Sequence, residues 1–96
     1  MAFGYAYLSV KINGRRSLKE RRGIVKSIIS RSRQQFNVSI ADLDIQPRSQ
    51  SAMIGVSAVA NRSYYARGVI DRLVEFLDRE LIGIGEIVDL HIEIED

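Results

Sequence analysis

The sequence predicts an α+β protein with the ferredoxin-like plait, in which a four-stranded antiparallel sheet carries two helices on one face. Three observations lead to this fold class. Segments with strand alternation and segments with helical periodicity follow one another in the order β-α-β-β-α-β. The chain has 96 residues, about the length of one domain. It contains no linker or low-complexity stretch, so residues 1–96 are expected to form a single ferredoxin-like domain.

The first predicted strand runs from Phe3 to Ile12. Its aliphatic side chains recur at every second position: Ala6, Leu8, Val10 and Ile12. We expect this face to enter the core, which leaves Tyr5 and Tyr7 on the open side of the sheet. Asn13-Gly14 then ends the strand in a turn.

The first predicted helix begins after Ser17 and ends at Asn37. Ser17 and Glu20 match a capping box, in which each side chain bonds the other's backbone N–H. Glu20 is therefore interpreted as structural and not as a general acid. Arg21 projects into the apolar arc, so we expect it at a sheet edge or in an ion pair. The predicted core stripe is Leu18, Val25, Ile28, Ile29, Ser32 and Phe36.

The second and third predicted strands surround a polar loop, Gln46–Ser51. The second covers Val38–Ile45, and its imperfect alternation predicts a bulge near Ala41-Asp42. The third, Ala52–Ala60, is apolar at almost every position, which is typical of a central strand.

The second predicted helix is capped by Asn61 or Ser63 and ends near Glu80. Its core stripe is predicted as Ala66, Val69, Ile70, Leu73, Phe76 and Leu77. The last strand covers Glu86–Glu95. Its residues predicted to face the core are Val88, Leu90, Ile92 and Ile94, and those predicted to face away are Asp89, His91 and Glu93.

Charge is distributed unevenly along the chain. Lys11–Arg33 holds nine of the fourteen basic residues and one acid, whereas the other residues hold five bases and eleven acids. Such asymmetry suggests an anionic partner, often a nucleic acid. A solvated basic helix face without a partner explains the same pattern, and composition alone does not decide between the two.

No residue pattern predicts an enzyme, a cofactor or a metal site. The chain has no cysteine, and its single histidine, His91, has only Asp89 and Glu93 near it on one strand. No serine has an adjacent base. The N-terminus lacks the pattern of a signal peptide, and no apolar stretch approaches the roughly 20 residues of a membrane span. We therefore expect a noncatalytic cytoplasmic protein without a membrane partner.

Several runs of residues resemble the YlxP-like family of small bacterial proteins of unknown function. They are SLKERR at 17–22, VKS at 25–27, FNVSIA at 36–41, IGV at 54–56, and Asn61. The resemblance covers most of the chain. It implies a ferredoxin-like fold and an association with genes for transcription and translation factors, including ribosome-maturation proteins. That association favours RNA as the anion. The family's loop before the third strand often carries a tryptophan, which QPRSQSAM lacks, so no role is assigned to this loop.

The predicted nucleic-acid-binding residues lie in the turn and the first helix. They are Arg15, Arg16, Lys19, Arg22, Lys26 and Arg33. Four of these fall in one helical stripe: Lys19, Arg22, Lys26 and Arg33. Basic side chains along such a stripe contact phosphates, and the helix N-terminus adds a favourable potential. The sequence thus predicts RNA or a ribosomal particle as the partner.

Tyr5 and Tyr7 have a separate interpretation. An open sheet face with tyrosines favours burial, so these two residues are predicted to form the interface of a homodimer. Stacking of RNA bases on them is less favoured, because Asp89 and Glu93 are predicted on the same face and would repel phosphate. A homodimeric protein-interaction module without nucleic-acid binding therefore remains the alternative function.

Overall fold

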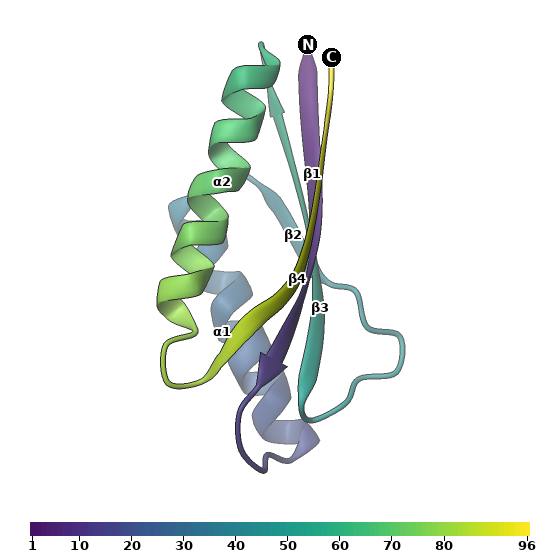
Figure 1. Ribbon diagram of the computed structural model, residues 1–96, viewed down its shortest axis with the longest axis vertical. Helices are drawn as coiled ribbons and strands as arrows, with labels where there is room; N and C mark the ends of the chain where they lie inside the picture. Colours follow the sequence, from purple (N-terminus) through teal and green to yellow (C-terminus); the bar gives the residue numbers. More distant parts are fainter.

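The computed structural model describes residues 1–96 and confirms the predicted plait. Its elements are β1 (Ala2–Ile12), α1 (Leu18–Gln35), β2 (Ser39–Asp42), β3 (Ser51–Ala60), α2 (Ser63–Glu80) and β4 (Gly85–Glu95). The strands form one antiparallel sheet in the order β2-β3-β1-β4, and both helices cover the same face of it (Figure 1). The other face is open. Neither helix is both long and apolar enough to cross a membrane.

The core lies between the inner face of the sheet and the two helices. Along β1, alternate residues are buried, as the sequence pattern predicted. The main cluster contains fourteen buried residues, among them Leu8 of β1, Ile54 of β3, Ile28 of α1 and Leu77 of α2. Since side chains from both helices and three strands meet there, the packing holds α1 firmly against the sheet.

The contact between α2 and the sheet depends on small residues at one end of the molecule. A Cβ atom at Gly4 would lie 2.7 Å from Ile94 Cδ1 and 2.8 Å from Ile70 Cδ1. Ala6 and Ala58 are buried against Ile70 in the same place. These small side chains let the first half of α2 approach the strands closely.

The predicted bulge near Ala41-Asp42 is wrong, because β2 pairs with β3 in unbroken register from Ser39 to Asp42. A β-bulge lies in β4 instead. Ser9 pairs with Asp89 and Val10 pairs with Ile87, which leaves Val88 without a partner opposite it. The extra residue reverses the alternation. Ile87 therefore packs on the core, whereas Val88, predicted to face the core, is 56% exposed.

Two further details differ from the sequence prediction. Leu18, predicted in the core stripe, is the first residue of α1 and is half exposed, because this turn lies at the end of the molecule (Figure 1). The second helix has Arg62 at its N-cap position and no capping side chain, so neither Asn61 nor Ser63 caps it.

Candidate functional site

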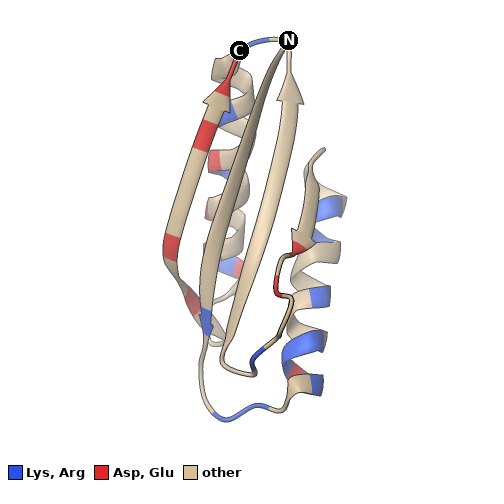
Figure 2. Cartoon of the chain, turned by 90° about the vertical axis from the view of Figure 1, so that its right-hand side faces the viewer, with Lys and Arg blue, Asp and Glu red and all other residues tan.

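Opposite charges gather on opposite sides of the molecule. Figure 2 shows acidic residues along β4, at one edge of the sheet, and basic residues along α1, beyond the other edge. The asymmetry found in the sequence is therefore also an asymmetry in space. The candidate site for an anion is α1 and its surroundings.

The start of α1 is closed by the predicted capping box. Ser17 Oγ accepts a hydrogen bond from the Glu20 N–H at 3.1 Å, and Glu20 Oε1 accepts one from the Ser17 N–H at 3.1 Å. The bond from the Ser17 backbone lowers the pKa of Glu20 below its usual value. A carboxylate thus already occupies the positive end of the helix dipole, so this end attracts phosphate less than the sequence suggested.

Arg21 is used for folding and not for binding. Its side chain is 2% exposed and contacts Asp42 at 2.7 Å and Asp44. It also donates to the Ser51 carbonyl at 3.1 Å. The prediction that Arg21 would be paired is confirmed. The pairing fastens the first turn of α1 to the chain after β2.

The carboxylate of Asp42 is held ionised by this network. Burial raises the pKa of Asp42, but hydrogen bonds from Arg21 and from the Asp44 N–H, together with the charge of Arg21, lower it by more. The pKa of Asp42 therefore lies below its usual value. The pKa of Arg21 is raised, first by its hydrogen bond to Asp42.

Three of the predicted binding residues line one groove between α1 and the edge strand β2. Arg22, Lys26 and Arg33 border a hollow of about 430 Å³, with Ser30 among them. We call this hollow the basic groove. Neither Arg22 nor Lys26 forms an ion pair. Lys19, also exposed, continues the same stripe toward the helix start.

Arg33 has a structural contact within the basic groove. Its Nη2 donates to the Ile40 carbonyl at 2.9 Å. Ile40 belongs to β2, which has no strand on its outer side. Arg33 therefore bonds a backbone carbonyl at the sheet edge that would otherwise be free to pair with another strand. Part of its charge remains at the exposed rim of the groove.

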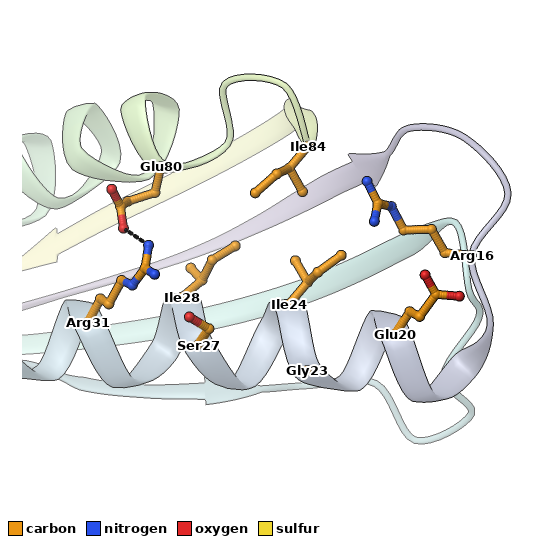
Figure 3. Close-up of a pocket in the computed structure, with 9 residues that line it drawn as sticks. All are labelled: Arg16, Glu20, Gly23, Ile24, Ser27, Ile28, Arg31, Glu80 and Ile84. Carbon is orange, nitrogen blue, oxygen red and sulfur yellow. Dashed lines mark hydrogen bonds and ion pairs between the residues drawn. The ribbon is translucent and has the colours of Figure 1, made fainter.

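Arg16 lies on the other side of α1, away from the basic groove. It donates to the Asn13 carbonyl at 3.1 Å and borders a second groove of about 400 Å³ toward α2. Figure 3 shows Ile24, Ile28 and Ile84 between Arg16 at one end and the Arg31–Glu80 pair at the other. The Arg31–Glu80 distance is 2.8 Å. Arg15 is exposed in the turn between β1 and α1. The six predicted residues thus divide between two sides of the helix.

The open sheet face places Tyr5 and Tyr7 as predicted. Their exposed fractions are 38% and 42%, and they border a hollow of about 270 Å³ beside Leu43. Tyr7 stacks on His91 with ring centroids 4.8 Å apart, and His91 Nε2 lies 3.0 Å from Glu93 Oε1. His91 is engaged by these neighbours, and no group of three potential metal ligands forms anywhere.

Sequence reasoning missed an aromatic and basic patch at the start of α2. Tyr64 and Tyr65 are 80% and 54% exposed, and they border a hollow of about 270 Å³ with Arg67 and Arg72. A signal was present, since two tyrosines stand among arginines in this segment. Helical periodicity identifies the residues of this helix that enter the core, but it does not indicate whether its exposed residues bind a ligand.

Comparison with known proteins gives the family. Residues 3–92 match the model of a family described as "Protein of unknown function (DUF503)". The chain is also 32% identical over 75 residues to "Uncharacterized protein YlxP" of Bacillus subtilis (strain 168), covering 78% of this chain and 82% of that protein.

Solved structures with low sequence identity share the fold. A structural-genomics protein named YJCS matches with a TM-score of 0.64 and 12% identity, covering 95% of this chain and 96% of that one. The de novo designed protein LFR1 1 with ferredoxin fold matches with a TM-score of 0.57 and 15% identity, covering 98% and 83%. These likenesses concern architecture alone. On the family match and the YlxP relative, the chain belongs to the DUF503 family, the YlxP-like proteins of unknown function that its SLKERR run predicted.

Proposed function

We propose that this protein is a noncatalytic RNA-binding protein that acts on RNA or a ribosomal particle in the cytoplasm. The observation that carries the proposal is the basic groove, in which the exposed and unpaired Arg22 and Lys26 stand beside Arg33. With Lys19 they extend over about 21 Å of helix axis, from a rise of about 1.5 Å per residue.

The groove suits a phosphate backbone. Guanidinium and ammonium groups donate to phosphate oxygens, and the hydroxyl of Ser30 offers one more donor. The only carboxylate at the groove is Asp42, which already faces Arg21. Exposed Arg15 would extend the contact from the adjoining turn. The association of YlxP-like proteins with genes for ribosome maturation makes RNA the favoured anion.

The family run SLKERR supports binding less directly than its charge suggests. Ser17 and Glu20 form the capping box, and Arg21 is buried in its ion pairs. Structural contacts therefore explain the presence of three of the six residues of this run. Lys19 and Arg22 are the residues of the run that no intramolecular contact explains, and both belong to the basic stripe.

The charge-reversed variant Arg22→Glu/Lys26→Glu tests this function. We expect its affinity for ribosomal RNA fragments to fall about tenfold or more at low salt, for all sequences alike, because phosphate contacts carry no base information. Fluorescence anisotropy of labelled RNA measures the affinity.

The matched control is Arg48→Glu/Arg79→Glu, which changes the net charge equally at exposed positions that do not line the groove. The control should bind nearly as well as the unchanged protein. Equal loss in both variants would show that only overall charge matters, and no loss in the groove variant would refute the groove as the binding site.

A second function is favoured by the open sheet face. Tyr5, Tyr7 and Leu43 are exposed and border one hollow, and this apolar surface suits an interface between two copies of the chain. This function requires no nucleic acid.

Substitution of both strand tyrosines tests the homodimer. If the face forms a dimer, Tyr5→Ser/Tyr7→Ser should halve the mass measured by analytical ultracentrifugation, because the variant loses the apolar contact area of two rings. Arg22→Glu/Lys26→Glu serves as the control and should keep the dimer mass. A protein that is monomeric before any substitution would contradict this function.

A further inference from the structure

We propose that Tyr64 and Tyr65, together with Arg67 and Arg72, bind an unpaired base of single-stranded RNA. This inference deepens the proposed function, on which it rests for the identity of the ligand. It concerns a surface that is separate from the basic groove, at the start of the other helix.

The two tyrosines are not needed for the packing of α2. The buried residues of this helix are Ala66, Ile70, Leu73, Phe76 and Leu77. Tyr64 and Tyr65 are not among them, and their exposed fractions are 80% and 54%. Neither hydroxyl forms a hydrogen bond within the chain. Two neighbouring exposed rings without a structural partner indicate a surface for a ligand.

The geometry of the pair leaves aromatic surface open for stacking. The ring centroids lie 5.4 Å apart with an interplanar angle of 78°, so the rings meet edge to face and do not cover each other. They border a hollow of about 270 Å³ whose other walls include Gly68 and Arg72. A planar base fits against an open ring face beside a guanidinium group.

Gly68 shapes this hollow. A Cβ atom at Gly68 would lie 3.2 Å from Arg72 Nη1, so the guanidinium group of Arg72 passes over the position that a larger residue would fill. Arg72 is thereby held close to the helix surface beside the tyrosines, where it can contact a base or its phosphate.

The charge of the patch favours an anionic ligand. Arg67 and Arg72 border the hollow with the tyrosines and with one acid, Asp71. Arg67 is paired with Asp71 at 2.9 Å, but both side chains are about half exposed, and such a pair contributes little stability. A phosphate can therefore replace the carboxylate at small cost. Base stacking with cations beside it is the pattern of single-strand binding sites.

The patch and the basic groove can be tested separately. Figure 1 places the start of α2 at one end of the molecule and the start of α1 at the other, and the longest axis measures 43 Å. A duplex can contact the basic groove through its phosphates, but its bases are not free to stack on Tyr64 and Tyr65. Single-stranded and duplex RNA therefore distinguish the two surfaces.

The experiment compares oligouridylate with an RNA duplex in binding to the full chain and to Tyr64→Leu/Tyr65→Leu. We expect the variant to lose affinity for oligouridylate by about fivefold or more, since one stacked base contributes about 1–3 kcal/mol. Its affinity for the duplex should not change. The chain has no tryptophan and four tyrosines, so quenching of tyrosine fluorescence by oligouridylate that is lost in Tyr64→Leu/Tyr65→Leu reports stacking on these two rings.

Two control variants complete the test. Ile82→Ser removes an exposed apolar side chain from the turn between α2 and β4, outside both proposed RNA surfaces, and should keep the affinity for oligouridylate. Arg22→Glu/Lys26→Glu should lower the affinity for both oligouridylate and the duplex. If it lowers neither, the basic groove is not an RNA-binding site, and the result for Tyr64→Leu/Tyr65→Leu still decides whether the tyrosine patch binds RNA. Unfolding midpoints of all variants show that they remain folded.

Two results would overturn the inference. One is an unchanged affinity of Tyr64→Leu/Tyr65→Leu for oligouridylate while the duplex still binds, which would leave the basic groove standing alone. The other is a change in oligomeric mass on substitution without a change in RNA affinity, which would assign the patch to a protein partner.

Discussion

Neighbouring residues of the basic segment Lys11–Arg33 have different surroundings in the fold. Arg21 and Arg22 are neighbours in the sequence, but the first is buried against Asp42 and Asp44 and the second is exposed at the basic groove. Helical periodicity predicted both placements, because one position lies in the apolar arc and the other beside it. It did not predict the partners of Arg21, which come from a strand end and a loop far along the chain.

The Asp42 carboxylate makes stability depend on pH. Its pKa is lower in the folded chain than its ordinary value of about 3.9. Above that value the carboxylate is ionised in both states, and its contribution is complete. As pH falls below about 4, the unfolded chain binds the proton first, so the free energy of unfolding decreases until the folded pKa is passed.

The variant Asp42→Asn should therefore lose less stability between about pH 5 and pH 2 than the unchanged protein, although it starts from a lower value. Urea unfolding at several pH values measures the difference. Glu20 titrates in both proteins and cancels in the comparison. Parallel curves for the two proteins would contradict the role of the Arg21–Asp42 pair.

Among the elements, α1 contains a glycine that its own packing does not require. Gly23 lies inside the helix, and a Cβ atom there would have no other atom within 4 Å. The variant Gly23→Ala should therefore stabilise the protein by about 0.5–1 kcal/mol, since alanine favours helix. The unfolding midpoint should rise by a few degrees, about 2–8 °C for a chain of this size.

Gly14→Ala is the matched control for this prediction. Gly14 also has open space around it, but its φ of +77° lies in the left-handed region. The same added methyl group should destabilise the protein there, because alanine is strained at positive φ. A lower midpoint for Gly23→Ala would mean that an unseen constraint acts on the middle of α1.

The order of the elements was predictable from local pattern, and some of their details were not. Val88, Leu90, Ile92 and Ile94 alternate without interruption in the sequence, yet the bulge exposes Val88. Its position is set by pairing with β1, which is a long-range contact. Likewise β2 is shorter than predicted and ends at Asp42, which pairs with Arg21 from α1, another long-range contact.

The candidate site was predictable only in part for the same reason. Arg22, Lys26 and Arg33 share a groove because helical spacing places them together. Arg16 precedes the helix, in a turn without regular periodicity, so the sequence pattern could not predict that its side chain lies on the opposite side of α1. Tyr64 and Tyr65 became a candidate only when their exposure was known.

At the scale of the whole molecule, the two edges of the sheet have opposite character. The edge at β2 is bordered by the basic residues of α1, whereas β4 forms an acidic edge (Figure 2). An RNA backbone bound in the basic groove would therefore lie on the side of α1, across the sheet from the acidic strand β4. The uncharged strand β3 and the tyrosines of β1 lie between these edges and stay available to a second copy of the chain.

The measurement that most directly tests the central claim is the affinity for ribosomal RNA fragments across a salt series. Contact between the basic groove and about four to six phosphates predicts a slope of log affinity on log salt of about −3 to −5. Arg22→Glu/Lys26→Glu should make that slope less steep by about one for each residue changed. A flat dependence, or no binding at low salt, would contradict the nucleic-acid function and leave the open sheet face as the functional surface.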